Sequence, residues 1–129
     1  MKNTVAILAV GVGGFIGSVM RYLLSLLGRQ VSITFPHGTL WANFLGCLVL
    51  GVTTAVATET QSLSPTTRLF IATGICGGFT TMSSFTYETF RFAQDSEYLY
   101  AAGYLVATIV GCIVLFGVGL FGTRLLLKG

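Results

Sequence analysis

Gly77-Gly78-Phe79-Thr80-Thr81-Met82-Ser83-Ser84-Phe85 lies inside an apolar segment that is long enough to cross a lipid bilayer. Two adjacent glycines are each about 1 kcal/mol less favourable than alanine in a helix, and threonine and serine add smaller penalties. Because an open backbone carbonyl is costly in lipid, a non-helical patch persists only where protein buries it or where it lines a watery cavity. The stretch therefore predicts a membrane helix that is broken in the middle and offers carbonyls to an ion.

The composition also indicates a membrane protein. The chain has 129 residues, a mean hydropathy of +0.85 and only 9% charged residues, against about 25% in soluble domains. The net charge of +3 comes from seven basic residues that are scattered singly. A chain without a basic run or face is not expected to bind nucleic acid.

Four segments are long and apolar enough to span a membrane: residues 4–27, 38–58, 67–92 and 98–127. A spanning helix needs about 20 mainly apolar residues. The first segment could be a signal peptide, but it is too long for a typical apolar core and no A-x-A-like cleavage site follows it. The short linkers predict antiparallel neighbours. We expect an all-helical membrane protein with one four-helix domain over residues 1–129.

The basic residues leave the orientation open. One face would hold both termini and four of these residues, Lys2, Arg68, Arg124 and Lys128. The opposite face would hold the other three, Arg21, Arg29 and Arg91. Positive-inside sorting needs an excess of lysine and arginine on one side. Insertion in both orientations and insertion with cytoplasmic termini are both compatible with this distribution.

Small residues recur at helical spacing. Gly13 and Gly17 are four residues apart in the first span, and Gly103, Ala107 and Gly111 repeat the spacing in the last. Such stripes allow membrane helices to approach closely. Four short helices enclose little interior, so we expect an oligomer.

Polar residues inside the spans are candidates for function, because they are costly in a membrane. Asn43 shares a helical stripe with Cys47 in the second span, and it could line a pore or simply bond a neighbouring helix. Tyr104, Thr108 and Cys112 form one hydrogen-bonding face in the last span. The three cysteines, Cys47, Cys76 and Cys112, have no metal-type spacing and are expected to be packed thiols.

Two charged residues lie within or beside the spans. Glu88 and Arg21 could form an ion pair, or they could mark the mouths of a pathway. His37 has no catalytic partner nearby and is expected to be a surface residue. The chain contains no nucleophile–base pair, phosphate loop or metal cluster, so an enzyme is not expected.

Phenylalanines favour an anion over a cation. Phe79 and Phe85 flank the predicted break, and Phe44 follows Asn43. The edge of an aromatic ring is electropositive. Together with an amide and hydroxyl donors, ring edges could replace the hydration of an anion and still release it, which conduction requires.

These residues give the chain a resemblance to the CrcB/Fluc fluoride channels over nearly its full length. The resemblance rests on Gly13-Gly14-Phe15-Ile16-Gly17, Arg21-Tyr22, Gly38-Thr39-Leu40, Asn43, Gly46, Gly77-Gly78-Phe79-Thr80-Thr81, Ser83-Ser84-Phe85, Glu88 and Tyr104. Each piece alone is weak, but their order and spacing within four spans are highly specific.

The resemblance implies an antiparallel, dual-topology homodimer in the cell (inner) membrane, with two fluoride pores at its interface and passive fluoride export that gives fluoride resistance. It implies six pore residues: Asn43, Phe85, Met82, Ser83, Tyr104 and Thr108. It implies three vestibule residues: Arg21, Thr39 and Glu88. It further implies a structural Na⁺ ion at the dimer interface, held by the backbone carbonyls of Gly77 and Thr80.

The chain departs from the family pattern at two positions. Met82 stands where family members usually have phenylalanine, and a thioether lacks a comparable ring edge. Phe116 stands one helical repeat beyond Cys112, where a hydroxyl is expected. A small dual-topology drug or cation exporter is the alternative, although its first helix needs an acid and this chain has Arg21 there. A non-transporting membrane subunit would explain only the glycine stripes.

Overall fold

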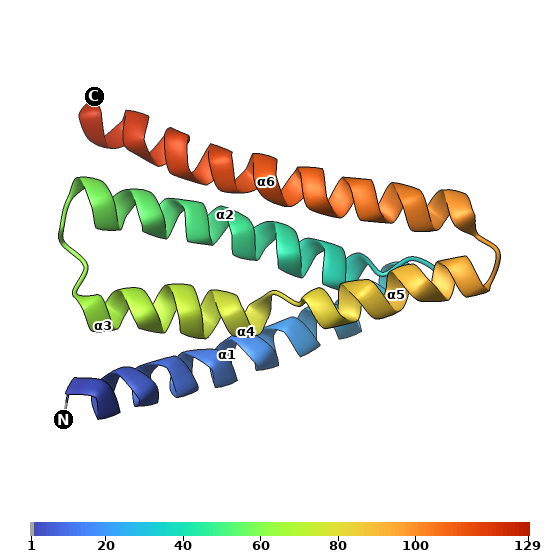
Figure 1. The fold of residues 1–129 in the computed structure, drawn as a ribbon, viewed down its shortest axis with the longest axis horizontal. Coiled ribbons are helices and arrows are strands. Elements are labelled where there is room, and N and C mark those ends of the chain that lie inside the picture. Colours follow the sequence, from blue (N-terminus) through green and yellow to red (C-terminus); the bar gives the residue numbers. More distant parts are fainter. Residues whose placement is uncertain (1) are drawn as a thin grey trace.

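The structure, a computed structural model, describes residues 2–129. Within this range, four helical segments are long and apolar enough to cross a membrane. They are α1 (Lys2–Val31), α2 (His37–Glu59), a compound segment over Pro65–Gln94, and α6 (Tyr98–Lys128) (Figure 1). The predicted all-helical membrane fold with an interrupted third segment is confirmed. The predicted spans lie inside these longer helices.

The third segment has four parts. It runs through α3 (Pro65–Arg68), a π-helical stretch η1 (Leu69–Cys76), the short α4 (Gly77–Phe79) and α5 (Met82–Gln94). The break between α4 and α5 consists of two threonines with extended backbones. Thr80 has φ −78° and ψ 157°, and Thr81 has φ −153° and ψ 117°.

The two glycines that led to the prediction of a break are themselves helical and have another role. Gly78 lies against α1, where a Cβ would collide with the carbonyl oxygen of Gly14 and come within 3.0 Å of its Cα. Gly77 has open space around it, with the nearest atom, the oxygen of Ala72, 4.0 Å away. The chain therefore breaks at the threonines, while Gly78 allows α4 to approach α1.

Two helix boundaries differ from the prediction. The third segment begins at Pro65 rather than at Thr66 or Thr67, because the Ser64 side chain accepts a hydrogen bond from the Thr67 N–H at 3.1 Å. Serine is a preferred N-cap and proline is well tolerated in the first turn. The first helix also continues beyond residue 27 to Val31, so only residues 32–36 connect it to α2.

The helices form a bundle in which α1 and the compound third segment run one way, and α2 and α6 run the other (Figure 1). Both termini lie at the end that also holds the α2–α3 loop. The α1–α2 loop and the α5–α6 turn lie at the opposite end. α2 packs mainly on α6, and α1 packs on η1 and α4. The break thus lies in the middle of the bundle, facing α2.

Glycines make the closest helix contacts. A Cβ on Gly17 would collide with the carbonyl oxygen of Ile75, and one on Gly51 would collide with that of Phe116. Small residues therefore bring backbones into contact at both α1–η1 and α2–α6. In the predicted stripe of Gly103, Ala107 and Gly111, Gly103 makes no close helix contact within this chain, because a Cβ there would have nothing within 4 Å.

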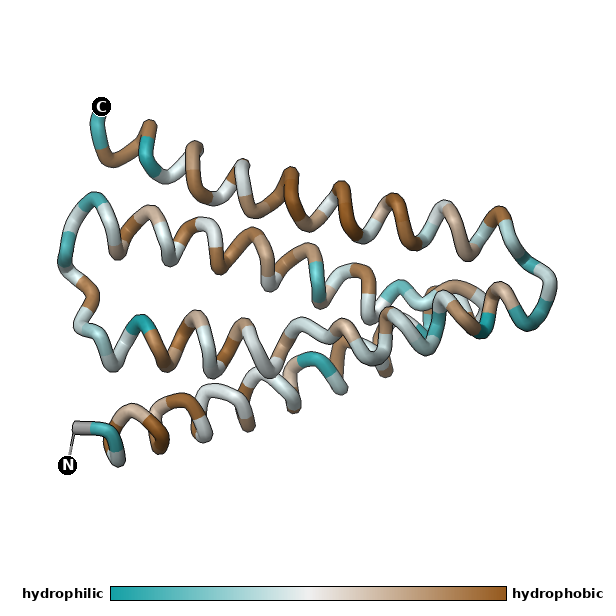
Figure 2. Tube along the Cα trace, in the orientation of Figure 1, coloured by the Kyte–Doolittle hydropathy of each residue, from teal (hydrophilic) through white to brown (hydrophobic). Residues whose placement is uncertain are grey.

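The outer surface is largely apolar. Ile7, Phe15 and Ile113 each have about two-thirds or more of their surface exposed, at 71%, 71% and 67%. Figure 2 shows hydrophobic residues along most of α6 and α1, with hydrophilic colour mainly at the bundle ends and on α5. This surface suits lipid or another apolar protein surface rather than water.

Candidate functional site

The Asn43 side chain on α2 holds the break in place. Its Oδ1 accepts a hydrogen bond from the Thr81 N–H at 2.7 Å, and its Nδ2 donates to the Thr81 carbonyl oxygen at 3.2 Å. Asn43 is 7% exposed. An amide that pairs with both backbone groups of one residue replaces two hydrogen bonds that an extended residue loses. Of the two roles considered for Asn43, bonding to a neighbouring segment is therefore observed.

Two backbone carbonyls at the break lose their helical donors. In a continuous helix, the Thr81 N–H would donate to the Gly77 carbonyl and the Ser84 N–H to the Thr80 carbonyl. Here the Thr81 N–H donates to Asn43, and the Ser84 N–H donates to the Thr81 hydroxyl at 3.1 Å. The carbonyls of Gly77 and Thr80 have thus lost their helical donors.

Arg21 reaches the same region from α1. Its Nε donates to the Gly78 carbonyl oxygen at 3.1 Å, close to the C-terminal end of α4. A cation is favourable at a helix C-terminus. The ion pairs found within residues 2–129 join Glu59 to Arg124 and Lys128, so the considered Arg21–Glu88 ion pair is wrong. Arg21 thus lies against α4, and its predicted place in a vestibule stays a prediction.

An inner cavity of about 410 Å³ borders the break. Asn43, Thr81, Met82, Phe85 and Thr108 contribute to its wall. The Thr108 hydroxyl is buried and has no hydrogen-bond partner within residues 2–129. A buried polar group without a partner costs free energy, and Thr108 brings such a group to the wall of this cavity.

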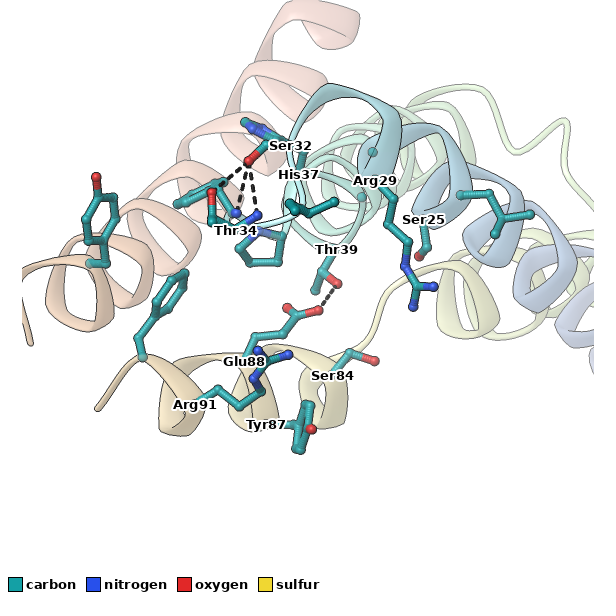
Figure 3. A pocket seen from close by; sticks show the side chains of 18 of the residues that line it. Ser25, Arg29, Ser32, Thr34, His37, Thr39, Ser84, Tyr87, Glu88 and Arg91 are labelled. Atoms are coloured by element: carbon teal, nitrogen blue, oxygen red, sulfur yellow. Dashed lines mark hydrogen bonds between the residues drawn. The ribbon is translucent and has the colours of Figure 1, made fainter. Parts of the chain in front are cut away.

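An outer cavity of about 910 Å³ opens near the α1–α2 loop (Figure 3). Its wall includes Thr39, Ser83 and Glu88, together with two arginines, Arg29 and Arg91. In Figure 3 the side chains of Glu88, Arg91, Tyr87 and Ser84 project from α5. The predicted vestibule residues Thr39 and Glu88 thus share one cavity, whose wall also holds charges of both signs, since Asp95 and Glu97 line it as well.

The Glu88 carboxylate joins three helices. Its Oε1 accepts from the Thr39 hydroxyl at 2.7 Å, and its Oε2 accepts from the Tyr104 hydroxyl at 2.7 Å. Both oxygens are acceptors, an arrangement that suits the ionised group. Tyr104 is 1% exposed, and its ring centroid lies 5.2 Å from that of Phe85. Tyr104 therefore lies behind the wall of the outer cavity, linking Glu88 to Phe85.

The two cavities lie on either side of the first turns of α5. Ser83 contributes to the outer wall, whereas Met82 and Phe85 contribute to the inner wall. On α2, Thr39 contributes to the outer wall, and Asn43, one helical turn later, contributes to the inner wall. Neutral polar side chains therefore line both cavities: the hydroxyls of Thr39 and Ser83 in the outer wall and the amide of Asn43 in the inner wall.

Several residues of the two cavities were not among the predicted site residues. Thr81 supplies the backbone partner of Asn43. Arg29 and Arg91 supply the positive charges of the outer cavity. The sequence did not single out Thr81 among the polar residues of the break, because only the fold shows that Asn43 faces it. The arginines were recognisable from their position at the same end of the bundle. Met82, 71% exposed, borders the inner cavity from its edge.

Comparison with known proteins identifies close relatives. The family model of the CrcB-like protein, Camphor Resistance (CrcB), matches residues 8–120. A fluoride-specific ion channel FluC of Chlorobium chlorochromatii is 44% identical over 118 residues, which cover 92% of each chain. A protein of the same name from Chlorobium phaeobacteroides (strain DSM 266) is 40% identical over 125 residues, 97% of each chain.

A protein of the same name from a further organism is also similar. The fluoride-specific ion channel FluC of Leptospira interrogans serovar Lai is 39% identical over 114 residues, which cover 88% of this chain and 90% of the relative. The matched residues 8–120 include the break and both cavities' polar residues. The chain belongs to the CrcB family of membrane proteins.

Proposed function

We propose that this chain forms a fluoride-selective channel through which cytoplasmic fluoride leaves the cell passively, giving fluoride resistance. The observation that carries the proposal is Thr108, a residue of the cavity wall beside the helix break whose buried hydroxyl lacks a partner within residues 2–129. The relatives named fluoride-specific ion channel support the choice of ion. The proposal is for a conducting protein and involves no catalytic step.

The outer cavity offers an anion separate positive groups rather than a positive field. Arg29 and Arg91 line its wall together with three acidic residues, Glu88, Asp95 and Glu97. Any attraction of fluoride is therefore local to the two guanidinium groups. The N-terminal turn of α5 adds its partial positive charge next to both cavities. In this proposal fluoride approaches along these groups before it loses water.

The inner cavity is suited to replacing that water. Moving a bare ion out of water is very costly, so the path has to offer closely placed donors. The Thr108 hydroxyl, the second N–H of the Asn43 amide and the ring edge of Phe85 are the neutral groups near the break. Neutral donors stabilise an anion without holding it as a lysine would, which allows it to leave.

The functional unit of this proposal is an antiparallel homodimer in the cell (inner) membrane, in contact with lipid. Four against three basic residues on the two faces permit insertion in both orientations. Gly103, Ile113 and Met82 lie on exposed surface of the single chain, and the inner cavity is open on this side. A second copy would close the inner cavity and complete the pore.

A structural Na⁺ ion between the two copies fits the released carbonyls. Gly77 is exposed on the single chain, and the carbonyls of Gly77 and Thr80 have lost their helical donors to Asn43 and the Thr81 hydroxyl. Unwound backbone carbonyls in membrane proteins are suitable ligands for Na⁺. The ion would act as the electrostatic partner of these carbonyl oxygens and would join the broken third segments of the two copies.

Flux through liposomes tests the proposal. Purified protein is reconstituted with internal fluoride or chloride, and efflux is followed with ion-selective electrodes after a potassium ionophore is added. We expect rapid fluoride efflux and negligible chloride efflux. Equal efflux of both ions, or no efflux above that of empty liposomes, would reject a fluoride-selective channel.

A further inference from the structure

The Arg21 side chain reaches the broken third segment from α1. Gly14, Gly17 and Arg21 follow one another on one face of α1, at helical spacing. The glycines bring the backbones together, since a Cβ on Gly78 would come within 3.0 Å of the Gly14 Cα. The Arg21 Nε then donates to the Gly78 carbonyl oxygen at 3.1 Å. The close packing of two helices thus holds this arginine against the end of α4.

The Gly78 carbonyl needs a donor because its helix ends directly after it. In a continuous helix this carbonyl would accept from the Met82 N–H, four residues later. The extended backbones of Thr80 and Thr81 instead place Met82 at the start of a new helix. An open carbonyl is costly inside a membrane. The Arg21 N–H therefore supplies the partner that the break removes.

The contacts of Arg21 are with the backbone of α4. Within residues 2–129, neither of the two cavities has Arg21 in its wall, and the ion pairs found there do not include it. The side chain is half-buried. Its charge lies at a helix C-terminus, where a cation is favourable. Arg21 is thus placed to act on the break, and through the break on what lies beyond it.

The break is held from two sides. Asn43 of α2 bonds to Thr81, just before α5, and Arg21 of α1 bonds to Gly78, near the end of α4. α4 has only three residues, of which two are glycines, so it has little helical stability of its own. Loss of the Arg21 contact would therefore free the half of the break that Asn43 does not hold.

We propose that Arg21 is a positioning residue, whose Nε–H fixes the end of α4 so that the carbonyls of Gly77 and Thr80 stay in place as ligands for a cation. The cation part rests on the proposed channel with its Na⁺ ion. The hydrogen-bond donor performs this role, rather than the attraction of fluoride by the positive charge. Donor and charge can be separated by substitution.

Three substitutions make this separation. The glutamine Nε2 lies the same number of bonds from Cα as the arginine Nε, so Arg21→Gln keeps a donor and removes the charge. Arg21→Met has a similar length and has neither. Arg21→Lys keeps the charge and moves the nitrogen one bond farther from Cα. A positioning role predicts that glutamine preserves the break and methionine does not, whereas anion attraction predicts that only lysine replaces arginine.

Hydrogen exchange of the full chain in detergent, read by mass spectrometry at several Na⁺ concentrations, tests the positioning. Amides of residues 77–83 should exchange about tenfold faster in Arg21→Met, the effect of one lost hydrogen bond to a charged group. Exchange in Arg21→Gln should stay close to that of the unmodified protein. Residues 110–125 of α6 should not change in either variant, which distinguishes a local effect from general destabilisation. Arg68→Met, at an exposed position of α3, is the control.

Sodium gives a second readout that loss of stability alone would not move. The Na⁺ concentration that half-protects residues 77–83 should rise in Arg21→Met and stay unchanged in Arg21→Gln. Unchanged exchange in Arg21→Met would overturn the positioning role. Arg21→Gln behaving as Arg21→Met while Arg21→Lys keeps the protection would also overturn it, because charge alone would then be sufficient.

Fluoride efflux from liposomes connects the positioning to conduction. Efflux should fall about tenfold in Arg21→Met, by the same lost hydrogen bond, and the fluoride concentration for half-maximal efflux should be equal in Arg21→Gln and the unmodified protein. A higher value in Arg21→Gln would assign the effect to charge and overturn the proposal. Absence of efflux from the unmodified protein would instead reject the channel function, and absence of Na⁺ protection would reject the Na⁺ site. The exchange of Arg21→Met would still decide whether Arg21 holds the break.

Discussion

Asn43 and Thr81 form a two-point contact across the bundle, with the Asn43 Oδ1 at 2.7 Å from the Thr81 backbone nitrogen and the Asn43 Nδ2 at 3.2 Å from the Thr81 oxygen. The two residues are separated by 38 positions in the sequence. The contact allows an extended backbone to exist in the middle of a membrane helix. It also frees the Gly77 carbonyl and places Asn43 in the wall of the inner cavity.

Asn43→Asp is expected to reduce both stability and fluoride efflux. The aspartate oxygen that replaces Nδ2 cannot donate to the Thr81 carbonyl, and a buried polar group left unpaired costs about 1–3 kcal/mol. Thermal unfolding in detergent and efflux from liposomes are the measurements. Thr53→Val is the matched control, because Thr53 bonds only to the Val49 carbonyl of its own helix. A variant with unchanged stability would show that the contact does not hold the break.

Thr108→Val is expected to separate function from stability. Since the Thr108 hydroxyl has no partner within residues 2–129, its removal should not lower the free energy of unfolding by more than about 0.5 kcal/mol, as at positions without special contacts. Fluoride efflux should nevertheless fall at least tenfold, because a donor to the anion is lost. Thr108→Ser should keep the efflux. Normal efflux by the valine variant would exclude this hydroxyl from the pore.

Tyr104→Phe is expected to destabilise the protein. The phenol donates to the Glu88 carboxylate, and hydrogen bonds to charged groups contribute about 1.5–3 kcal/mol. The Glu88 carboxylate would keep only the Thr39 hydroxyl as donor. Tyr100→Phe is the control on the same helix, since Tyr100 is exposed. Chemical unfolding curves of the two variants should differ in midpoint, and equal midpoints would contradict the linking role of Tyr104.

Gly17→Ala is expected to loosen the contact between α1 and η1. Its Cβ would collide with the Ile75 carbonyl and lie 2.8 Å from the Phe79 nitrogen, and backbone atoms cannot move aside easily. Overpacking costs about 1–3 kcal/mol. Gly11→Ala is the control on the same helix, because nothing lies within 4 Å of its position. Thermal unfolding of both variants in detergent tests the difference, and equal melting temperatures would show that this close approach is unnecessary.

Gly77→Val is expected to affect assembly more than the fold of the single chain. A Cβ at this position has no neighbour closer than 4.0 Å, yet the side chain would project where the proposed second copy and Na⁺ meet. Chemical crosslinking should show fewer dimers, and fluoride efflux should fall, while far-UV circular dichroism stays unchanged. Replacing Na⁺ with N-methylglucamine throughout purification should also reduce efflux. Normal dimers and efflux in Gly77→Val, together with normal efflux after Na⁺ removal, would argue against a carbonyl-lined Na⁺ site.

Local sequence signals were sufficient for most of the fold. Apolar length identified the four membrane segments, and poor helix formers identified the region of the break. The position of the break within that region required the structure, because Gly77 and Gly78 are weaker helix formers than the threonines and are nevertheless helical. Gly78 is held in a helix by its packing on Gly14, a contact between distant parts of the chain.

The candidate site was predictable as a set of residue types, but not as a network. Asn43, Glu88 and Tyr104 stood out because polar groups are costly inside a membrane. Their partners could not be deduced from spacing: Asn43 bonds to Thr81, and Glu88 bonds to Tyr104 rather than pairing with Arg21. The carbonyl partner of Arg21 carries no sequence signal, because every residue has a backbone carbonyl and the sequence distinguishes residues only by their side chains.

The amino-acid sequence by itself determined that this protein is helical, crosses the membrane four times and interrupts its third crossing, because hydropathy and helix propensity act over short distances along the chain. Tertiary structure alone decided which backbone groups the interruption exposes and which side chains meet them. Those choices depend on the packing of glycines at helix crossings and on hydrogen bonds between residues such as Asn43 and Thr81, which only the folded bundle brings together.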